Sequence, residues 1–444
     1  MSARPSSARP SLRRRLKDLE ARLGAESPDR LPLLAAARTL DRALKRPGFL
    51  RSDESLAMRV PWWPVVAVLG TAGSGKSTFV NRLLGAPAAG GEEGGGFTLL
   101  AHGSAPPGPA DPRLPPGLPV GEGGLRPAAS DSDALKGLVL VDTPGFDGAH
   151  DAPPGLVEAV VEAADLVLVF FDACHPDPPA IRSTLHRLAP GCRSKVVCVL
   201  NKIDACATDD DVETLVGVWK EVLAQAGLVE GIYAVYDADA AGADAPLLAD
   251  AERRARFAAR CDAQFAEIRK RIDAVRDGRA EQIRTLLAGA AAAVDGEQVP
   301  LVRRALRRWR WRVLLADVLW IGLLAGLAAG AVHLAGRETL PPFVSWLVEG
   351  RVNWARGVPV RLVGAFAVVM ALLVAGHLWL RAAAAQGIAA GLPEQAGEAG
   401  LDPRRAFRRA TRVFRSLFRA NPVGWGRGAA RRVAKARESL VARA

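Results

Sequence analysis

Cysteine is scarce in this sequence, and its spacing excludes the common thiolate metal sites. Among 444 residues there are five cysteines, and no two of them form a CxxC pair. A zinc site is therefore not expected. An odd number of thiols also fits a reducing compartment. The five are Cys174, Cys192, Cys198, Cys206 and Cys261.

The sequence also lacks an apolar run near its start, an internal repeat and a balance of charge. Its first residues, MSARPSSARPSLRRRLKDLEARLG, contain no apolar segment, so no cleaved signal peptide is expected. Lysine and arginine number 59 against 47 aspartates and glutamates, which leaves a formal net charge of +12. Such a surplus predicts a polyanionic partner, either nucleic acid or an acidic membrane surface.

Length and composition predict several units rather than one compact domain. Leucines recur at helical spacing in residues 11–23 and 31–44, and these helices either pack on the next domain or dock on a membrane-proximal stalk. The expected division is a basic helical segment at 1–60, a nucleotide domain at 61–245, a charged helical stalk outside the sheet at 246–312, an apolar hairpin at 313–381 and a basic tail at 382–444.

Short apolar runs alternate with helical patterns between residues 61 and 245, which predicts an α/β domain whose mainly parallel sheet is covered by helices on both faces. Residues 85–130 are rich in glycine and proline and are expected to be mostly mobile loop, with one strand in FTLLAHGS. Other strands are expected at 65–69 and in LKGLVLVDTPG, ADLVLVFFDA, SKVVCVLNKID and GIYAVYDA, and helices at 78–84, 154–164, 179–188 and 211–226.

A glycine-rich turn follows the first strand and fits GxxxxGK[ST] in full, from Gly70 to Ser77. Glycines there let backbone N–H groups converge on phosphates, and the following helix adds its positive dipole end. Lys76 is expected to reach the β- and γ-phosphates, and the Ser77 hydroxyl is expected to ligate Mg²⁺. The nucleotide-binding residues predicted in this turn are Gly70, Gly73, Ser74, Gly75, Lys76, Ser77 and Thr78.

Two further motifs lie at the ends of later strands. In Asp142-Thr143-Pro144-Gly145, Asp142 is expected to hold Mg²⁺ through water, while the Gly145 N–H faces the γ-phosphate. In Asn201-Lys202-Ile203-Asp204, a carboxylate can accept two hydrogen bonds from the N1–H and N2–H₂ edge of guanine, which adenine cannot supply. Asn201 is expected to tie this loop to the phosphate loop, and the Lys202 stem to cover the base.

Two positions near these motifs bear on hydrolysis. Thr98 is the candidate for a threonine that closes on Mg²⁺ and the γ-phosphate, which makes it both a catalytic and a metal candidate; a purely structural role in a strand is the alternative. Phe146 follows Gly145, and an apolar ring cannot orient a water molecule. GTP hydrolysis is therefore expected to be slow, or to be completed by other groups.

These motifs resemble those of the translation-factor class of P-loop GTPases. More narrowly, FTLLAHGS and the run from ADLVLVFFDA to NKID resemble the dynamin superfamily, especially the EH-domain-containing ATPases, over residues 61–245. The resemblance implies nucleotide-driven pairing of the GTPase domains, a helical stalk and membrane remodelling. Two departures are Gly73, where many dynamin-type loops carry a catalytic serine, and the lack of an EH domain. The EH-domain-containing group uses ATP, so the sequence leaves both GTP and ATP as candidate nucleotides.

Two apolar segments predict a hairpin of membrane spans. Residues 313–335 would measure about 34 Å as a helix, against a hydrocarbon thickness of about 30 Å, and residues 362–380 form the second segment. Arginines flank both segments, which places both termini in the cytoplasm; a buried or re-entrant hairpin is the alternative. Asp317 is expected to pair with Arg310 or Arg312 at the interface.

The tail from Arg404 to Arg419 mixes arginine with apolar residues at helical spacing, which predicts a helix lying on anionic lipid rather than a nucleic-acid site. The leading hypothesis is thus a membrane-anchored, dynamin-like GTPase that uses Mg²⁺, forms nucleotide-dependent homodimers or oligomers, and remodels or tethers membranes. The Ala/Arg/Gly bias points to a bacterial inner membrane. The alternatives are a tethered regulatory switch that recruits a protein partner and a ribosome-associated GTPase.

Overall fold

The computed structural model describes the chain in two compact units. One comprises Met1–Ala35 and Ala57–Thr285, and the other comprises Ala36–Leu56 and Leu286–Ala444. The described residues are 11–87, 96–108, 111–114, 117–121, 123–145, 155–175, 193–203, 209–225, 228, 232–235, 251–335, 360–397, 399–413 and 415–442.

A seven-stranded sheet forms the centre of the first unit, in the order β3-β2-β4-β1-β5-β6-β7. All neighbouring pairs are parallel except β2 with β4, which is antiparallel. The predicted mainly parallel α/β sheet is therefore confirmed. The strands are β1 (Val65–Gly70), β2 (Thr98–His102), β3 (Arg126–Ser130), β4 (Val139–Asp142), β5 (Leu166–Asp172), β6 (Val196–Asn201) and β7 (Ile232–Val235).

Strand β3 corrects the expectation that residues 85–130 are mostly loop. It pairs in parallel with β2, from Thr98 opposite Arg126 to His102 opposite Ser130. Its sequence, RPAAS, has little of the β-branched and aromatic character that marks a strand. Because β3 lies at the edge of the sheet, Pro127 removes no hydrogen bond that a second neighbour would need.

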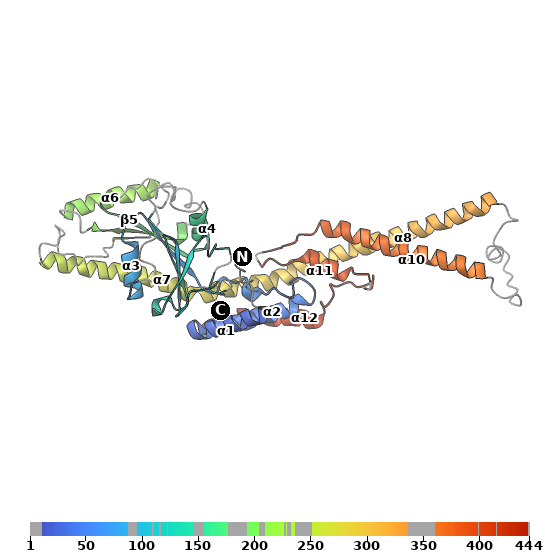
Figure 1. Ribbon diagram of the computed structural model, residues 1–444, viewed down its shortest axis with the longest axis horizontal. Helices are drawn as coiled ribbons and strands as arrows, with labels where there is room; N and C mark the ends of the chain where they lie inside the picture. Colours follow the sequence, from blue (N-terminus) through green and yellow to red (C-terminus); the bar gives the residue numbers. More distant parts are fainter. Residues whose placement is uncertain are drawn as a thin grey trace, which may run out of the picture. The chain divides into compact units, whose positions relative to one another are not determined.

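Helices cover both faces of this sheet, as the sequence predicted. Figure 1 shows α6 (Asp209–Gln225) above the strands, and α3 (Lys76–Leu84) and α7 (Ala251–Ala293) below them. Phe79 of α3 contacts Phe170 of β5 with ring centroids 5.2 Å apart. On the opposite face, Phe171 contacts Trp219 of α6 at 5.7 Å. The remaining helices of this unit are α1 (Leu12–Glu26) and α4 (Leu156–Ala163). The helix predicted at 179–188 lies outside the described residues.

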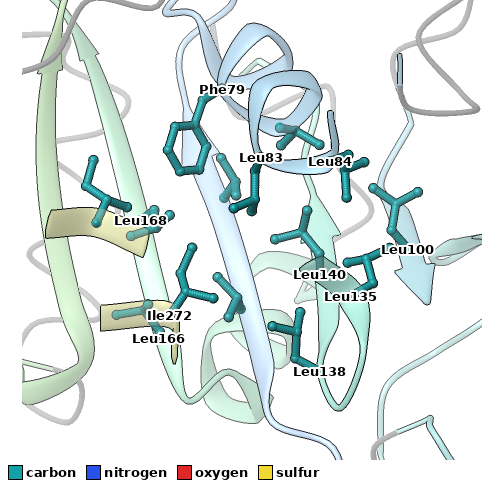
Figure 2. Packing of buried hydrophobic residues seen from close by; sticks show 14 of the residues in the cluster. Phe79, Leu83, Leu84, Leu100, Leu135, Leu138, Leu140, Leu166, Leu168 and Ile272 are labelled. Atoms are coloured by element: carbon teal, nitrogen blue, oxygen red, sulfur yellow. The ribbon is translucent and has the colours of Figure 1, made fainter. Parts of the chain in front are cut away.

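Helix α7 is part of the core of the first unit, which corrects its assignment to a stalk outside the sheet. Its buried residues Cys261, Ile268 and Ile272 recur at helical spacing within a charged sequence. Figure 2 shows Ile272 in one cluster with Phe79 and Leu83 of α3 and with strand residues. Sixteen of the 43 residues of α7 are charged, and many of its apolar residues are alanines, so the stripe of larger apolar side chains that faces the core is narrow.

Two buried arginines fasten α7 to the sheet. Arg279 makes an ion pair with Asp165, whose carboxylate also accepts a hydrogen bond from the Val65 N–H at 2.9 Å. Arg30 donates to the carbonyls of Trp62 at 2.7 Å and Arg276 at 2.8 Å. Burial lowers the pKa of both guanidinium groups, Arg30 and Arg279, from the ordinary value. These contacts join segments that are far apart in the sequence.

The second unit is built from helices, and α8 and α10 lie side by side in it (Figure 1). Trp309 of α8 donates its indole N–H to the Arg381 carbonyl at 3.1 Å, and the Arg381 guanidinium lies 5.1 Å from the Trp309 ring centroid. The helices that lie wholly or partly in this unit are α2 (Leu31–Lys45), the end of α7 (residues 286–293), α8 (Val299–Ala335), α10 (Val360–Ala390), α11 (Pro403–Ala410) and α12 (Arg427–Val441).

By length and composition, one helix among the described residues could cross a membrane, namely Ala367–Ala390, with a mean hydropathy of 1.8. The two predicted spans are thus reduced to one candidate on these criteria. It overlaps the second predicted segment. The first predicted segment lies in α8, where Leu315, Leu319 and Leu327 are more than half exposed.

Asp317 does not pair with Arg310 or Arg312, which corrects the sequence expectation. Its carboxylate lies 2.8 Å from Nδ1 of His377 on α10. Arg310 instead donates to the carbonyl of Leu417 at 3.2 Å. The antiparallel packing of α8 and α10 determines this pairing, because residue 377 then lies beside residue 317.

The tail does not form one helix over residues 404–419. Helix α11 ends at Ala410, and Phe407 on it is fully buried within the second unit. Phe407 is therefore a packing residue rather than a lipid contact. Phe418, outside the helix, is 72% exposed.

Candidate nucleotide site

The turn between β1 and α3 has a backbone that requires glycine. Gly70 has φ 152°, and a Cβ at this position would lie 2.5 Å from the Phe170 carbonyl oxygen. Gly73 and Gly75 also have positive φ values, 70° and 87°. Gly75 immediately precedes α3, so the turn delivers its backbone N–H groups to the start of a helix.

Lys76 lies inside this turn. It is 5% exposed, and its ammonium donates to the carbonyls of Gly70 at 3.1 Å and Thr71 at 2.6 Å. Ser74 is fully buried, and its hydroxyl also donates to the Thr71 carbonyl, at 2.8 Å. Ser77 is exposed, and Thr78 is half-buried. The Lys76 ammonium is therefore surrounded by carbonyl oxygens of the turn, and the next residue, Ser77, has an exposed side chain.

Asp142, at the end of β4, carries an unsatisfied acceptor. Its Oδ1 is buried and has no hydrogen-bond partner among the described residues. Burial raises the pKa of this carboxyl to about 6, although the Lys76 ammonium opposes the shift. A buried carboxylate oxygen without a donor is costly, and a hydrated divalent cation would satisfy it. The residues at this strand end thus fit Mg²⁺, with Ser77 and Asp142 as the groups that could hold it.

The segment after Asp142 packs tightly on the phosphate loop. The Thr143 hydroxyl donates to the Val68 carbonyl at 2.8 Å, which fastens the segment to β1. At Gly145, a Cβ would lie 2.2 Å from the Cα of Ala72 in the loop. Only glycine fits this approach, so the DTPG turn and the phosphate loop are held against each other.

Thr98 begins β2 directly opposite Asp142 in the antiparallel register. Residues paired in this way project their side chains from the same face of a sheet. The Thr98 hydroxyl donates to the Gly96 carbonyl at 3.3 Å. The threonine predicted from sequence is thus beside the acidic strand end.

The NKID loop is tied to the phosphate loop, as expected from sequence. The Asn201 side-chain amide donates to the Ser74 carbonyl at 2.8 Å, and Asn201 is buried. Lys202 has φ 64°, an uncommon value for a residue with a side chain, and its ammonium lies 3.0 Å from the Asp172 carboxylate. Asp204 and Phe146 lie outside the described residues.

A comparison with protein families supports this reading of the geometry. Residues 65–202 match the family model described as 50S ribosome-binding GTPase. This part of the chain is a GTPase domain. The match covers less than half of the 444-residue chain. No curated protein matches the chain.

Solved structures similar to the GTPase domain and its surroundings include bacterial dynamins. One of them is a protein of an oligomerised bacterial dynamin pair, which is described as a mechanism for long-range sensing and tethering of membranes. The sequence identity is 14% and the TM-score is 0.35. The match covers 86% of this chain and 60% of that protein. For LeoA, a bacterial dynamin GTPase from ETEC, the sequence identity is 14% and the TM-score is 0.32. That match covers 97% of this chain and 86% of LeoA. Era from Aquifex aeolicus is 23% identical, with a TM-score of 0.25, and the match covers 39% of this chain and 50% of Era.

Asp172 is the residue of the GTPase domain that sequence reasoning did not assign. It ends β5, accepts a hydrogen bond from the Cys174 N–H at 2.9 Å through Oδ1, and holds Lys202 through Oδ2. It is therefore a positioning residue for the NKID loop. Its position in the sequence could have indicated this role, because Asp172 ends a buried strand at the same sheet edge as Asp142 and Asn201.

Proposed function

We propose that this chain is a membrane-anchored, dynamin-like GTPase in which nucleotide binding pairs the GTPase domains and drives remodelling or tethering of a bilayer. One observation carries the proposal. The same polypeptide contains a phosphate loop fastened to two further nucleotide motifs, and a pair of packed helices with exposed apolar side chains.

The chemistry of the site follows from its donors. Backbone N–H groups of the turn from Gly70 to Thr78 bind phosphate oxygens, and the Lys76 ammonium exchanges its carbonyl partners for β- and γ-phosphate oxygens. Ser77, Thr98 and Asp142 are the proposed Mg²⁺ residues. When bound, Mg²⁺ neutralises charge on the phosphates. The Gly145 N–H, held against the loop, faces the γ-phosphate.

Base selection is assigned to the NKID loop. Asn201 fixes this loop on the phosphate loop, and Asp172 holds Lys202 so that its stem can cover a purine ring. Asp204 accepts from the guanine edge. Titration with GTP and ATP tests this: Asp204→Asn should weaken GTP binding while leaving ATP binding unchanged, and equal affinity of the wild type for both nucleotides would contradict it.

Membrane anchoring through both α8 and α10 is supported by the apolar side chains that these helices leave uncovered. Val318, Leu319 and Ile321 on α8 are 55–66% exposed. On α10, Val368 is 60% exposed and Val374 is 52% exposed. Burying such surface in hydrocarbon is favourable by about 25 cal/mol per Å². Alkaline washing of membranes should leave the protein in the pellet; its release would remove the anchoring claim.

Pairing and remodelling rest on the resemblance of the sequence motifs to the dynamin superfamily. Sedimentation velocity in detergent should show a larger species with a non-hydrolysable GTP analogue than with GDP. Liposomes carrying the protein should change shape or cluster when GTP is added. Unchanged liposomes together with an unchanged mass would instead favour a tethered switch that recruits a protein partner.

A ribosome-associated GTPase is the second candidate. The matching family's description names ribosome binding, and the net charge of +12 suits RNA. Sedimentation of the solubilised protein with ribosomes at moderate salt distinguishes the two. We expect no co-sedimentation above the level of a detergent-solubilised control protein of similar charge.

A further inference from the structure

The second unit contains a pocket of about 240 Å³ between α8 and α10. Three arginines of α8 line it at four-residue spacing, Arg304, Arg308 and Arg312. Residues at this spacing lie on one helical face about 6 Å apart along the axis. All three side chains are exposed, and none makes a hydrogen bond or ion pair with the described residues. The pocket therefore presents a row of cations without protein anions.

Helix α10 supplies the open space opposite this row. Gly387 in the helix and Gly391 just after its end line the pocket, and a Cβ at Gly387 would meet no atom within 4 Å. Ile388 of α10 and Leu392, which follows the helix, make its apolar side together with Leu301 of α8. No acidic residue is part of the lining. A ligand that fits this pocket is anionic at one end and apolar at the other.

The pocket lies where the apolar surface of the helix pair ends. Trp311 and Trp379 are 73% and 70% exposed, as expected of side chains at a membrane interface. Leu315 and Leu319 continue the face of Arg308 and Arg312 along α8, and both are more than 60% exposed. A molecule whose charged group lies at the arginines would thus have its chains along these leucines.

We infer that this pocket is a binding site for the headgroup of an anionic phospholipid. The phosphodiester accepts hydrogen bonds from the arginine guanidinium groups, and the acyl chains pass Leu315 and Leu319. This inference rests on the proposed membrane anchoring, because it places the pocket at headgroup depth. It differs from the tail contact predicted from sequence, since none of the lining residues belongs to residues 404–419. A nucleic acid would leave the leucine face unused.

The test is native mass spectrometry of the full chain in detergent, with dioleoyl phosphatidylglycerol or dioleoyl phosphatidylcholine added. We expect one retained phosphatidylglycerol, with a roughly tenfold preference over phosphatidylcholine. The triple variant Arg304→Gln, Arg308→Gln, Arg312→Gln should lose that preference. Gly387→Leu should also lose it, because the side chain fills the pocket while every charge stays.

A matched control removes three arginines elsewhere in the same unit. Arg427, Arg431 and Arg432 are exposed on α12, and their replacement by Gln should leave the retained lipid unchanged. Equal loss in this control, or retention in both pocket variants, would overturn the inference. Glycerol 3-phosphate is added as a further ligand. If it binds as tightly as the lipid, the pocket is a site for a free phosphate ester and not for lipid.

Failure of the pocket and failure of the anchor are distinguishable. If the pocket variants and the wild type bind lipid alike but stay in the membrane pellet after alkaline washing, only the lipid site is wrong. If the wild type leaves the membrane on washing, the anchoring proposal is wrong as well.

Discussion

At the scale of the residue, Asp142 shows how a site can be recognised by an unfavourable environment. Its carboxylate lies at a strand end, with one buried oxygen that no described group satisfies. Stability alone does not account for such an arrangement, because a neutral side chain would cost less there. A cation-dependent function does account for it.

Replacing this carboxylate should change how stability depends on pH. Burial raises the pKa of Asp142 to about 6 from 3.8, so the folded protein binds more protons than the unfolded chain between these values. The free energy of unfolding of the nucleotide-free protein therefore falls as pH rises from about 4 to above 6. Asp142→Asn should remove that part of the fall and melt at a higher temperature than the wild type at pH 7.5.

Thermal melting of both proteins from pH 4.5 to pH 8, without nucleotide, checks this expectation. With GDP and Mg²⁺ added at pH 7.5, the order should reverse, because only the wild type gains stability by binding. Melting curves that differ by the same amount at every pH would contradict the assigned environment of Asp142.

At the scale of the element, α7 and the α8–α10 pair show how long helices with simple sequences acquire specific neighbours. Arg279 of α7 meets Asp165, and Asp317 of α8 meets His377 of α10. Each pair joins residues far apart in the chain. Helical periodicity predicted that these helices exist, but it could not predict which residues they would meet.

Removing Arg279 should detach α7 from the sheet. In Arg279→Leu, Asp165 is left partly buried without its cation, which should lower the free energy of unfolding by roughly 3 kcal/mol. Hydrogen exchange at Ile268 and Ile272 should accelerate, and the melting temperature should fall. Lys136→Gln is the control, since its ion pair with Asp133 is on the surface and contributes little. Equal effects of the two substitutions would show that the Arg279–Asp165 ion pair does not hold α7 on the sheet.

Close contact between α8 and α10 should depend on Gly376. A Cβ at this position would lie 2.2 Å from Nε1 of Trp320. Small residues allow membrane helices to approach closely, so Gly376→Leu should force these two apart and lower the melting temperature by roughly 3–6 °C. Gly322→Leu on α8 is the matched control, because a Cβ there meets nothing within 4 Å. A similar loss for both would exclude a specific contact at Gly376.

At the scale of the whole molecule, the phosphate loop and the helices that we propose to attach to a membrane belong to different units. The phosphate loop lies in the unit that contains Ala57–Thr285, and α8 and α10 lie in the unit that contains Leu286–Ala444. The two activities should therefore be separable by substitution, even if GTP-dependent work on a bilayer requires both.

Lys76→Ala should separate them. Loss of the ammonium should weaken binding of a fluorescent GTP analogue roughly 100-fold and abolish the GTP-dependent increase in mass. Resistance to alkaline washing should stay at the wild-type level, because Lys76 belongs to the unit that contains Ala57–Thr285, whereas α8 and α10 belong to the other unit. Release of the variant by the wash would mean that attachment depends on nucleotide rather than on the helices.

Sequence by itself determined the α/β GTPase architecture, the phosphate loop, and the strand-end places of Asp142 and Asn201. Each of these is encoded in a few consecutive residues whose order dictates a strand, a turn and a helix. Strand β3 was missed because RPAAS carries no strand signal and needs only its neighbour β2.

Tertiary structure alone decided the burial of the Asp142 oxygen and the arginine-lined pocket. It also decided three ion pairs, namely Asp172 with Lys202, Arg279 with Asp165, and Asp317 with His377. All of these depend on which side chains packing brings together across dozens of residues. Local propensity carries no information about such distances, because they are set by the shapes of the packed faces.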